Sequence, residues 1–247
     1  GMSIQRSVMN SEISLVTFSG YDKLFNLTGI NAFGMGADIS FPKIDIVYGY
    51  RHTKLIGLGF TNFINGFTIR SDIGFFSTKD NNSDIRKGKT FVNQAYDSLH
   101  FSYPIEEKAE YYQLNIQFEY ELTSKTSLLM QFFNYDILNY SSGELPIDEE
   151  IDIPNLEIDP SQLSPEKLFI PGLGSPFAAL SKQSLVMNIN RYFLDNQLLL
   201  NFGSLLDFNQ DKRISGTMNS IGLEYDIAEN IQIKGNLTNI SGSKDHP

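Results

Sequence analysis

The chain has 247 residues, no cysteine, and 29 acidic against 19 basic residues, for a formal net charge of −10. The absence of cysteine excludes disulfides, thiolate metal sites and a cysteine nucleophile, and the negative charge disfavours a nucleic-acid partner, which is bound by clustered Lys and Arg. Aromatic residues are frequent, with 19 Phe and 12 Tyr but no Trp, and no stretch approaches the ~20 consecutive apolar residues of a membrane-spanning helix.

Alternation of apolar and polar residues predicts strands along much of the chain. The clearest runs from Tyr112 to Leu122, where apolar residues of one parity alternate with Gln, Asn and Glu of the other. A helix would place apolar residues on all sides of this segment, so we prefer a strand. In chain order, the predicted strands are 44–50, 55–61, 67–75, 112–122, 128–139, 185–193, 198–208, 220–227 and 231–238. We expect about nine or ten strands and no long helix.

Short and long connections alternate between these strands. Tight turns are predicted at 62–66, 123–126, 194–196 and 228–230. Long loops are predicted at about 78–110 and 141–181, with a shorter one at 209–214. Transmembrane barrels have this rhythm, because their periplasmic turns are short and their outward loops are long. A predicted turn at 51–54 breaks the rule, since it is short where a long loop is expected.

The pattern predicts an all-β fold: an antiparallel up-and-down (meander) β-barrel of the transmembrane type, or an incomplete barrel, as a single domain over residues 1–247. A porin directs its polar residues toward a wet lumen and its apolar residues toward lipid, and polar faces rich in Gln, Asn and Glu with few Lys favour this arrangement. A second interpretation is a soluble lipocalin-like barrel that binds an apolar ligand and turns Tyr112, Leu114, Ile116 and Phe118 inward. A third is a structural or adhesive envelope barrel without a transport role.

Three stretches carry a family resemblance. Residues 56–76 form a predicted hairpin with a glycine turn, followed by Arg70 and Asp72 on the wet face; residues 111–140 form a second hairpin; residues 180–242 resemble closing strands. In these stretches the chain resembles large Gram-negative outer-membrane porins of the alginate-export-like and uncharacterised families. The resemblance implies a location in the bacterial outer membrane. Such porins usually end in a further strand, whereas this chain ends at Pro247 and shows no export signal at its start, so we expect the later part of a truncated barrel.

The polar parity of the predicted strands supplies the candidate pore lining. These residues are Arg70, Asp72, Gln113, Asn115, Gln117, Glu119, Glu121, Asn201, Glu224 and Lys234. Arg70 and Asp72 select solutes in one interpretation and form a structural ion pair in the other. Glu119 and Glu121 lie on one face of a single strand without a recognisable cleft, which disfavours catalysis by paired carboxylates.

An acidic stretch follows within the second long loop. Its six candidate residues are Asp148, Glu149, Glu150, Asp152, Glu157 and Asp159. Carboxylates suit Ca²⁺ and Mg²⁺, but the spacing is not that of an EF-hand. A solvated external loop is the simpler interpretation, and a loop that folds inward and narrows the pore is the alternative.

No motif in the sequence points to an enzyme, a metal or a cofactor. His52, His100 and His246 are isolated, and no nucleophile elbow or phosphate-binding loop is present. We therefore expect a channel for passive diffusion of small solutes, with outer-membrane lipid and those solutes as partners. Neutral or cationic solutes are expected, because a polyanion such as alginate favours a lining rich in Lys and Arg. Open strand edges of a fragment would favour pairing with a second copy.

Overall fold

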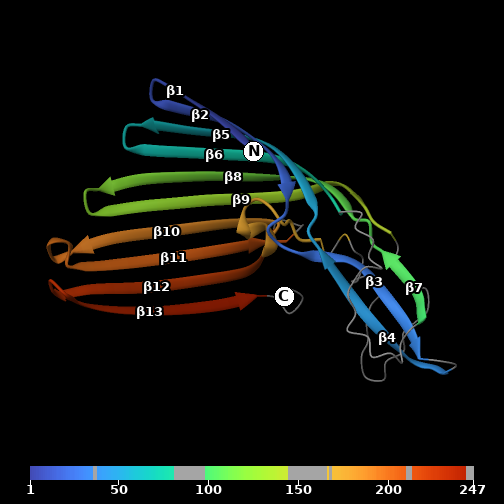
Figure 1. The fold of residues 1–247 in the computed structure, drawn as a ribbon. Coiled ribbons are helices and arrows are strands. Elements are labelled where there is room, and N and C mark those ends of the chain that lie inside the picture. Colours follow the sequence, from blue (N-terminus) through green and yellow to red (C-terminus); the bar gives the residue numbers. More distant parts are fainter. Residues whose placement is uncertain (36–37, 81–97, 144–165, 167–168, 210–212, 243–247) are drawn as a thin grey trace.

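The computed structural model describes residues 1–35, 38–80, 98–143, 166, 169–209 and 213–242. Ten strands form one antiparallel sheet, in the order β1-β2-β5-β6-β8-β9-β10-β11-β12-β13 (Figure 1). They are β1 (Met2–Val8), β2 (Ser11–Tyr21), β5 (His52–Ile64), β6 (Phe67–Lys79), β8 (Lys108–Thr123), β9 (Thr126–Ser141), β10 (Gln183–Phe193), β11 (Leu198–Phe208), β12 (Ile214–Ala228) and β13 (Ile231–Gly242). Within the described residues β1 and β13 do not pair, so this large sheet is open at both edges. The predicted antiparallel meander is confirmed, as an open sheet.

A second, three-stranded sheet extends beyond one end of the large sheet. Its order is β4-β3-β7, from β3 (Asn26–Met35), β4 (Asp38–Gly49) and β7 (Ser98–Pro104). It lies at the end opposite the tight turns (Figure 1). The β3–β4 hairpin interrupts the meander between β2 and β5, which pair with each other.

This small sheet corrects two predictions. The turn predicted at 51–54 is wrong, because the chain there returns from the β3–β4 excursion and enters β5; the Asp22 amide donates to the Arg51 carbonyl at 2.8 Å. Residues 22–51 are therefore the long connection that the alternation rule required. The loop predicted at 78–110 is also partly wrong, because it contains β7; its residues 81–97 lie outside the described part of the chain.

Two short 3₁₀ helices complete the described structure. They are η3 (Pro176–Ala179) and η4 (Leu194–Asn196), the latter in the predicted turn between β10 and β11. No helix in the described part of the chain is long and apolar enough to cross a membrane.

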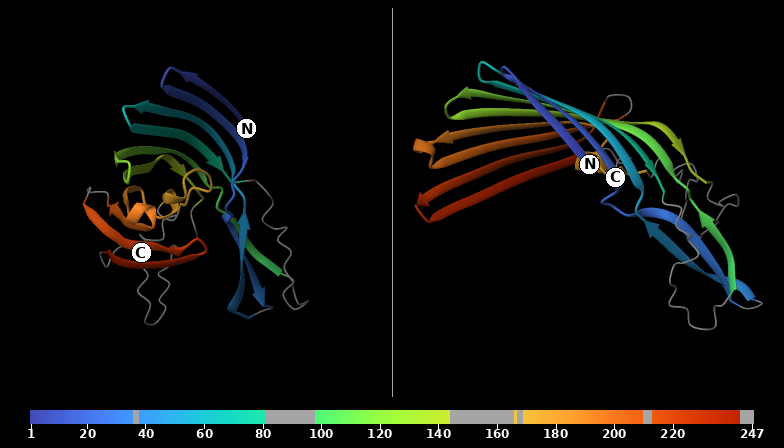
Figure 2. Two further views of the ribbon diagram at one scale, coloured as in Figure 1. Left: turned by 90° about the vertical axis from the view of Figure 1, so that its left-hand side faces the viewer. Right: turned by 45° about the horizontal axis from the view of Figure 1, so that its top comes forward.

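The large sheet curves, and its two faces differ in polarity. The polar parity includes Tyr111 and Gln113, which contact a segment that lies inside the arc of the sheet (Figure 2, left). The apolar parity therefore faces outward, where Ile56 is 60 % exposed and Ile221 is 59 % exposed. Cross-strand partners keep this arrangement in register, as in the row Leu58, Ile73 and Leu114. The convex face is apolar, and much of the concave face is polar.

This orientation contradicts the lipocalin-like interpretation. That fold requires Tyr112, Leu114, Ile116 and Phe118 inside the barrel. Their neighbours Tyr111 and Gln113 occupy the concave face, so the pleat of β8 places all four on the convex face.

The hairpin between β5 and β6 provides a test of the fold. Asn65 and Gly66 both have positive φ, at 46° and 83°, as a two-residue type I′ turn requires. We expect Gly66→Ala to lower the free energy of unfolding by about 1 kcal/mol, measured by denaturant titration in detergent micelles. Gly235→Ala is the control, because its Cβ would meet nothing within 4 Å. An equal effect of both substitutions would contradict the turn assignment.

Candidate functional site

The candidate lining residues all fall on the concave face. Arg70 and Asp72 on β6 pair with Gln117 and Asn115 on β8, and the same parity includes Glu119 and Glu121. Near the other edge of the sheet and on the same face, Glu224 on β12 pairs with Lys234 on β13, and Asn201 on β11 pairs with Gly222 on β12. The structure thus brings the predicted lining onto one surface.

Two ion pairs on this surface join neighbouring strands. Arg70 Nη1 lies 3.1 Å from Glu119 Oε1, and the Gln117 amide donates to the same carboxylate oxygen. Lys234 Nζ lies 2.8 Å from Glu224 Oε2. These are half-buried or exposed pairs, which usually stabilise a fold by less than about 1 kcal/mol. Their main effect is to fix the positions of these charges on the concave face.

Carboxamides fill the space between the charged pairs. Gln131 Nε2 donates to Asn115 Oδ1 at 2.9 Å. Asn201 Nδ2 donates to Asn188 Oδ1 at 3.1 Å and to Asn190 Oδ1 at 2.6 Å. A carboxamide both donates and accepts hydrogen bonds, so these side chains can satisfy one another and still offer polar groups to a solute.

A segment of the second long loop folds onto the concave face; we call residues 169–181 the inward segment. The Leu173 carbonyl accepts from Tyr111 Oη at 3.4 Å and from Gln113 Nε2 at 3.3 Å. The Ser175 amide donates to Gln113 Oε1 at 2.7 Å. The segment, including η3, lies inside the arc of the strands (Figure 2, left), so it narrows the space on this side.

Two glycines allow this close approach. A Cβ on Gly174 would overlap the Gln113 carboxamide, and Gly174 has a φ of 110°, which other residues rarely adopt. A Cβ on Gly172 would overlap the Asp22 carboxylate. The inward segment therefore depends on glycine at both positions.

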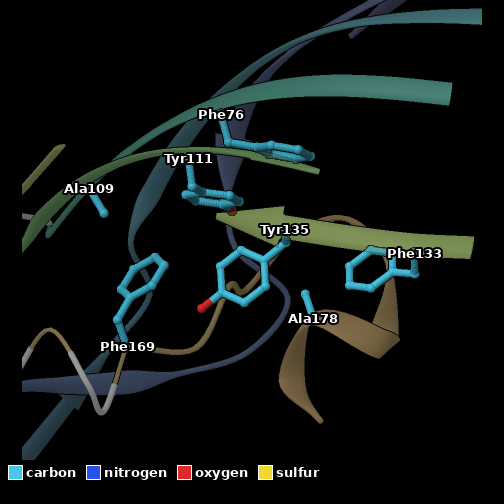
Figure 3. Close-up of a cluster of buried hydrophobic side chains, with 7 residues drawn as sticks. All are labelled: Phe76, Ala109, Tyr111, Phe133, Tyr135, Phe169 and Ala178. Carbon is cyan, nitrogen blue, oxygen red and sulfur yellow. The ribbon is translucent and has the colours of Figure 1, made fainter. Parts of the chain in front are cut away.

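Aromatic side chains pack the inward segment against the concave face of the large sheet. Tyr111 stacks on Phe76 with ring centroids 4.7 Å apart and meets Phe169 edge to face at 5.5 Å. Phe133 and Tyr135 from β9 complete the cluster with Ala178 of η3 (Figure 3). This buried cluster is a local core at the long-loop end of the concave face, whereas the opposite end carries the carboxamides and charged pairs.

Buried charges anchor the beginning of the inward segment; we call Asp22, Arg51, Asp80 and Glu107 the anchor cluster. Arg51 is 2 % exposed. Its Nη1 pairs with Glu107 Oε1, its Nε lies 3.4 Å from Asp22 Oδ2, and its Nη2 donates to the Ile170 carbonyl. Its guanidinium also lies 4.6 Å from the centre of the Phe169 ring. Arg51 therefore joins the ends of β2, β5 and β8 to the inward segment.

Burial disfavours the ionised form of the carboxyl groups in the anchor cluster. Burial raises the pKa of Asp22, Asp80 and Glu107 above their usual range, although hydrogen bonds and the Arg51 guanidinium act in the opposite direction. All three lie beyond the ends of the strands of the large sheet. Further donors limit the cost: the Glu107 amide donates to Asp80 Oδ2 at 2.9 Å, and Tyr140 Oη to Glu107 Oε2 at 3.1 Å.

Neither the anchor cluster nor the inward segment was singled out from the sequence. One signal was available, because Phe169, Ile170, Leu173 and Phe177 are too apolar for a solvated loop. The predicted acidic residues at 148–159 lie outside the described residues, as does the proposal that they narrow the pore. Among described residues, no group of three or more His, Asp or Glu side chains is arranged to hold a metal ion.

The inward segment leaves part of the concave face uncovered. A hollow of about 330 Å³ remains beside it, bounded by Gly174 and Ser175 and by the walls of β2, β5, β6 and β8. Asp72 and Asn115 line this hollow. Gln113 lines the same hollow, so three of the predicted lining residues meet the narrowed region directly.

No protein-family model matches the sequence, and no curated protein matches it. Among solved structures, the fold is similar to one described as "KdgM porin in complex with disordered oligogalacturonate". The two share 10 % sequence identity with a TM-score of 0.31, over 97 % of this chain and 88 % of that chain. Similarity at this level carries no conclusion about family or function.

Gly174→Ala tests the docking of the inward segment. The added methyl group collides with Gln113 at a positive φ, so we expect the amides of residues 172–175 and 177–181 to lose protection from hydrogen exchange by at least about tenfold, equivalent to ~1.4 kcal/mol. Gly222→Ala is the control, because its Cβ would lie 3.6 Å or more from its neighbours on the same face. Unchanged protection in Gly174→Ala would contradict the docked arrangement.

Glu107→Gln tests the anchor cluster through its pH dependence. The raised pKa of Glu107 means that the folded state binds more protons than the unfolded state above about pH 4, so this group lowers stability as the pH rises. Glutamine does not titrate. We therefore expect the free energy of unfolding of Glu107→Gln to increase relative to the wild type between pH 4 and pH 8.

Glu110→Gln, which removes an exposed carboxylate from the same strand, is the control for general charge effects. A wild-type protein that gains stability over Glu107→Gln as the pH rises would refute the assigned direction. Denaturant titrations in detergent micelles at each pH provide the free energies.

Proposed function

We propose that the chain forms the wall of an outer-membrane channel of the porin type, through which small solutes diffuse passively. The polarity of the large sheet carries this proposal. Its convex face is apolar and exposed, and its concave face carries hydrogen-bonding and charged groups. A water-soluble barrel would have the opposite arrangement, whereas a barrel in lipid requires this one.

The height of the apolar band fits a membrane. On β8 the convex residues from Tyr112 to Tyr120 are uncharged, and at roughly 3.4 Å per residue they span about 27 Å along the strand. Transmembrane strands tilt by about 35–45°, so this length corresponds to a height of about 19–22 Å, close to the apolar band of about 25 Å in membrane barrels. Lys108 and Glu110 follow at the long-loop end, where the strand would leave the lipid.

Aromatic residues flank this band. Near the tight turns, Phe67 stacks on Tyr120 with ring centroids 3.9 Å apart and lies 5.3 Å from Phe118. Near the long loops, Phe75 and Tyr112 are cross-strand partners on the convex face. Girdles of aromatic residues mark both interfaces of membrane barrels, and Phe and Tyr supply them here without Trp.

The inward segment supports a narrowed passage. It is fixed to the concave wall by Gln113, Tyr111 and Arg51. A solute that moves along the concave face passes this segment and the adjacent hollow, lined by Asp72 and Asn115. The proposed mechanism is diffusion past a polar constriction, without a covalent step.

Charge on the concave face favours neutral or cationic solutes. The basic residues of the described strands on this face are Arg70 and Lys234, and each is paired with a glutamate. By register the acidic residues of the same face are Glu12, Asp72, Glu119, Glu121, Asp207, Glu224 and Asp226. A negative lining attracts cations and repels anions. Membership of the alginate-export-like family stays a prediction, and a polyanionic substrate does not fit these residues.

Recordings in planar lipid bilayers test the function. We expect stepwise conductance with cations permeating more readily than anions, and a smaller preference after Glu119→Gln and Glu121→Gln together. Leu122→Gln on the convex face is the control. A clear preference for anions would overturn the proposed solute class, and a protein that stays monodisperse in buffer without detergent would overturn the channel.

Ile116→Arg tests the lipid-facing assignment. An arginine near the middle of the apolar band should lower the free energy of unfolding in lipid by ~2–4 kcal/mol. Gln117→Arg, one residue further on the concave face, should cost less than about 1 kcal/mol. Denaturant titration in lipid vesicles measures both, and equal losses would contradict the assignment.

A further inference from the structure

Basic side chains gather on the convex face at the long-loop ends of β5, β6 and β8, the end of the large sheet that carries the small sheet (Figure 1). We call His52, Lys54, Lys79 and Lys108 the basic patch. His52 on β5 pairs with Lys79 on β6, which pairs with Lys108 on β8. Lys54 shares the face of His52, because alternate residues of a strand point to the same side. The three lysines are exposed.

The lysines of this patch repel one another. Lys79 and Lys108 are direct cross-strand partners, and like charges in this position destabilise a sheet. None of the three lysines forms an ion pair with a residue that the structure describes. An anion held between the ammonium groups would remove this repulsion.

Four acidic residues lie near Lys79 and Lys108 in the sequence, and three of them have other partners. Asp80 and Glu107 are directed to the inner side, into the anchor cluster. Glu110 lies on the convex face, where its carboxylate accepts a hydrogen bond from an asparagine of β9 at 2.8 Å. Glu106 is exposed in the connection before β8. The basic patch thus stands out in a chain whose formal net charge is −10.

The surface next to the patch favours a lipid headgroup over a free anion. Ile56, Phe75 and Tyr112 form a cross-strand row on the convex face beside it. Ile56 is 60 % exposed and Phe75 is 51 % exposed. A lipid can place its acyl chains on this apolar row and its phosphate on the lysines, whereas a free phosphate ion contacts the lysines alone. Lysine side chains extend along a protein surface and keep their ammonium groups at the level of the headgroups.

We propose that the basic patch binds the phosphate group of an anionic lipid in the leaflet at the long-loop end of the strands. The ammonium groups of Lys79 and Lys108 donate to the phosphate oxygens, and Lys54 adds positive charge beside them. The acyl chains lie on Ile56 and Phe75. A bound lipid therefore joins β5, β6 and β8 where they leave the hydrocarbon. This inference rests on the lipid-facing assignment of the convex face that the proposed function also requires.

The experiment is isothermal titration of the full chain in dodecylmaltoside micelles with dihexanoyl phosphatidic acid, with protein-free micelles as the blank. We expect saturable binding at least about tenfold tighter than that of dihexanoyl phosphatidylcholine, whose headgroup carries a compensating positive charge. Inorganic phosphate should also bind at least about tenfold more weakly, because it has no acyl chains to place on the apolar row.

Single substitutions locate the site. Lys79→Gln and Lys108→Gln should each weaken binding of dihexanoyl phosphatidic acid about fivefold. Lys125→Gln is the control, since it removes the same charge from a tight turn at the opposite end, where Lys125 Nζ lies 3.4 Å from Asp195 Oδ1. In micelles without lipid, Lys108→Gln should unfold at no lower denaturant concentration than the wild type, because it relieves the repulsion.

Three results would overturn the proposal. Equal binding of phosphatidic acid and phosphatidylcholine would show that charge plays no part, and equal binding of inorganic phosphate would replace the lipid by a free anion. Unchanged binding by both lysine variants would place the lipid elsewhere. Failure of the proposed function is seen separately, because equal losses in Ile116→Arg and Gln117→Arg would remove the lipid-facing surface itself.

Discussion

The pleat of the β-strand is the constraint on which the structure depends. Neighbouring side chains must point to opposite faces. In each strand of the large sheet, one set of alternate residues therefore lies on the convex face and the other set on the concave face. On β8, Ile116 lies on the convex face and Gln117 on the concave face. Because this orientation repeats across the sheet, the exposed convex surface is apolar. Most apolar side chains of the sheet therefore lie on that surface and not in a buried core. In the proposed channel, lipid is the solvent of this apolar surface.

Among the residues that the structure describes, the position of the buried aromatic cluster follows from the same constraint. A polar concave face cannot be filled by side chains of the sheet alone, so the inward segment supplies the missing apolar surface at one end. Arg51 holds that segment through the Ile170 carbonyl and the Phe169 ring. Buried charges lower stability when they are unpaired. Because three carboxyl groups surround the single guanidinium of Arg51, the stability of this attachment depends on pH. The segment that narrows the proposed passage is therefore attached through buried charged contacts.

The predictability of the fold from the sequence depended on the contrast between the two faces. Polar and apolar residues alternate without interruption over residues 112–122 of β8 and 220–227 of β12, and these parts of the two strands were predicted. The first residues of both strands, 108–111 and 214–219, do not continue this alternation and were missed. On β2, Val16 and Phe18 are apolar on the concave face while Ile13 and Leu15 are apolar on the other, so no alternation marked the strand. The docking of Arg51 could not be predicted, since its partners Asp22, Glu107 and Ile170 come from three distant segments that only the tertiary structure brings together.

The measurement that tests the central claim most directly is spin-label accessibility along β12 in lipid vesicles. Single cysteines, in a chain that otherwise has none, would carry labels at Ile221, Gly222, Leu223 and Glu224. If the convex face meets lipid, labels at 221 and 223 collide mainly with oxygen dissolved in the bilayer, and labels at 222 and 224 mainly with a water-soluble nickel complex. The reverse alternation, or water access at all four positions, would contradict a sheet whose apolar face is its outer face.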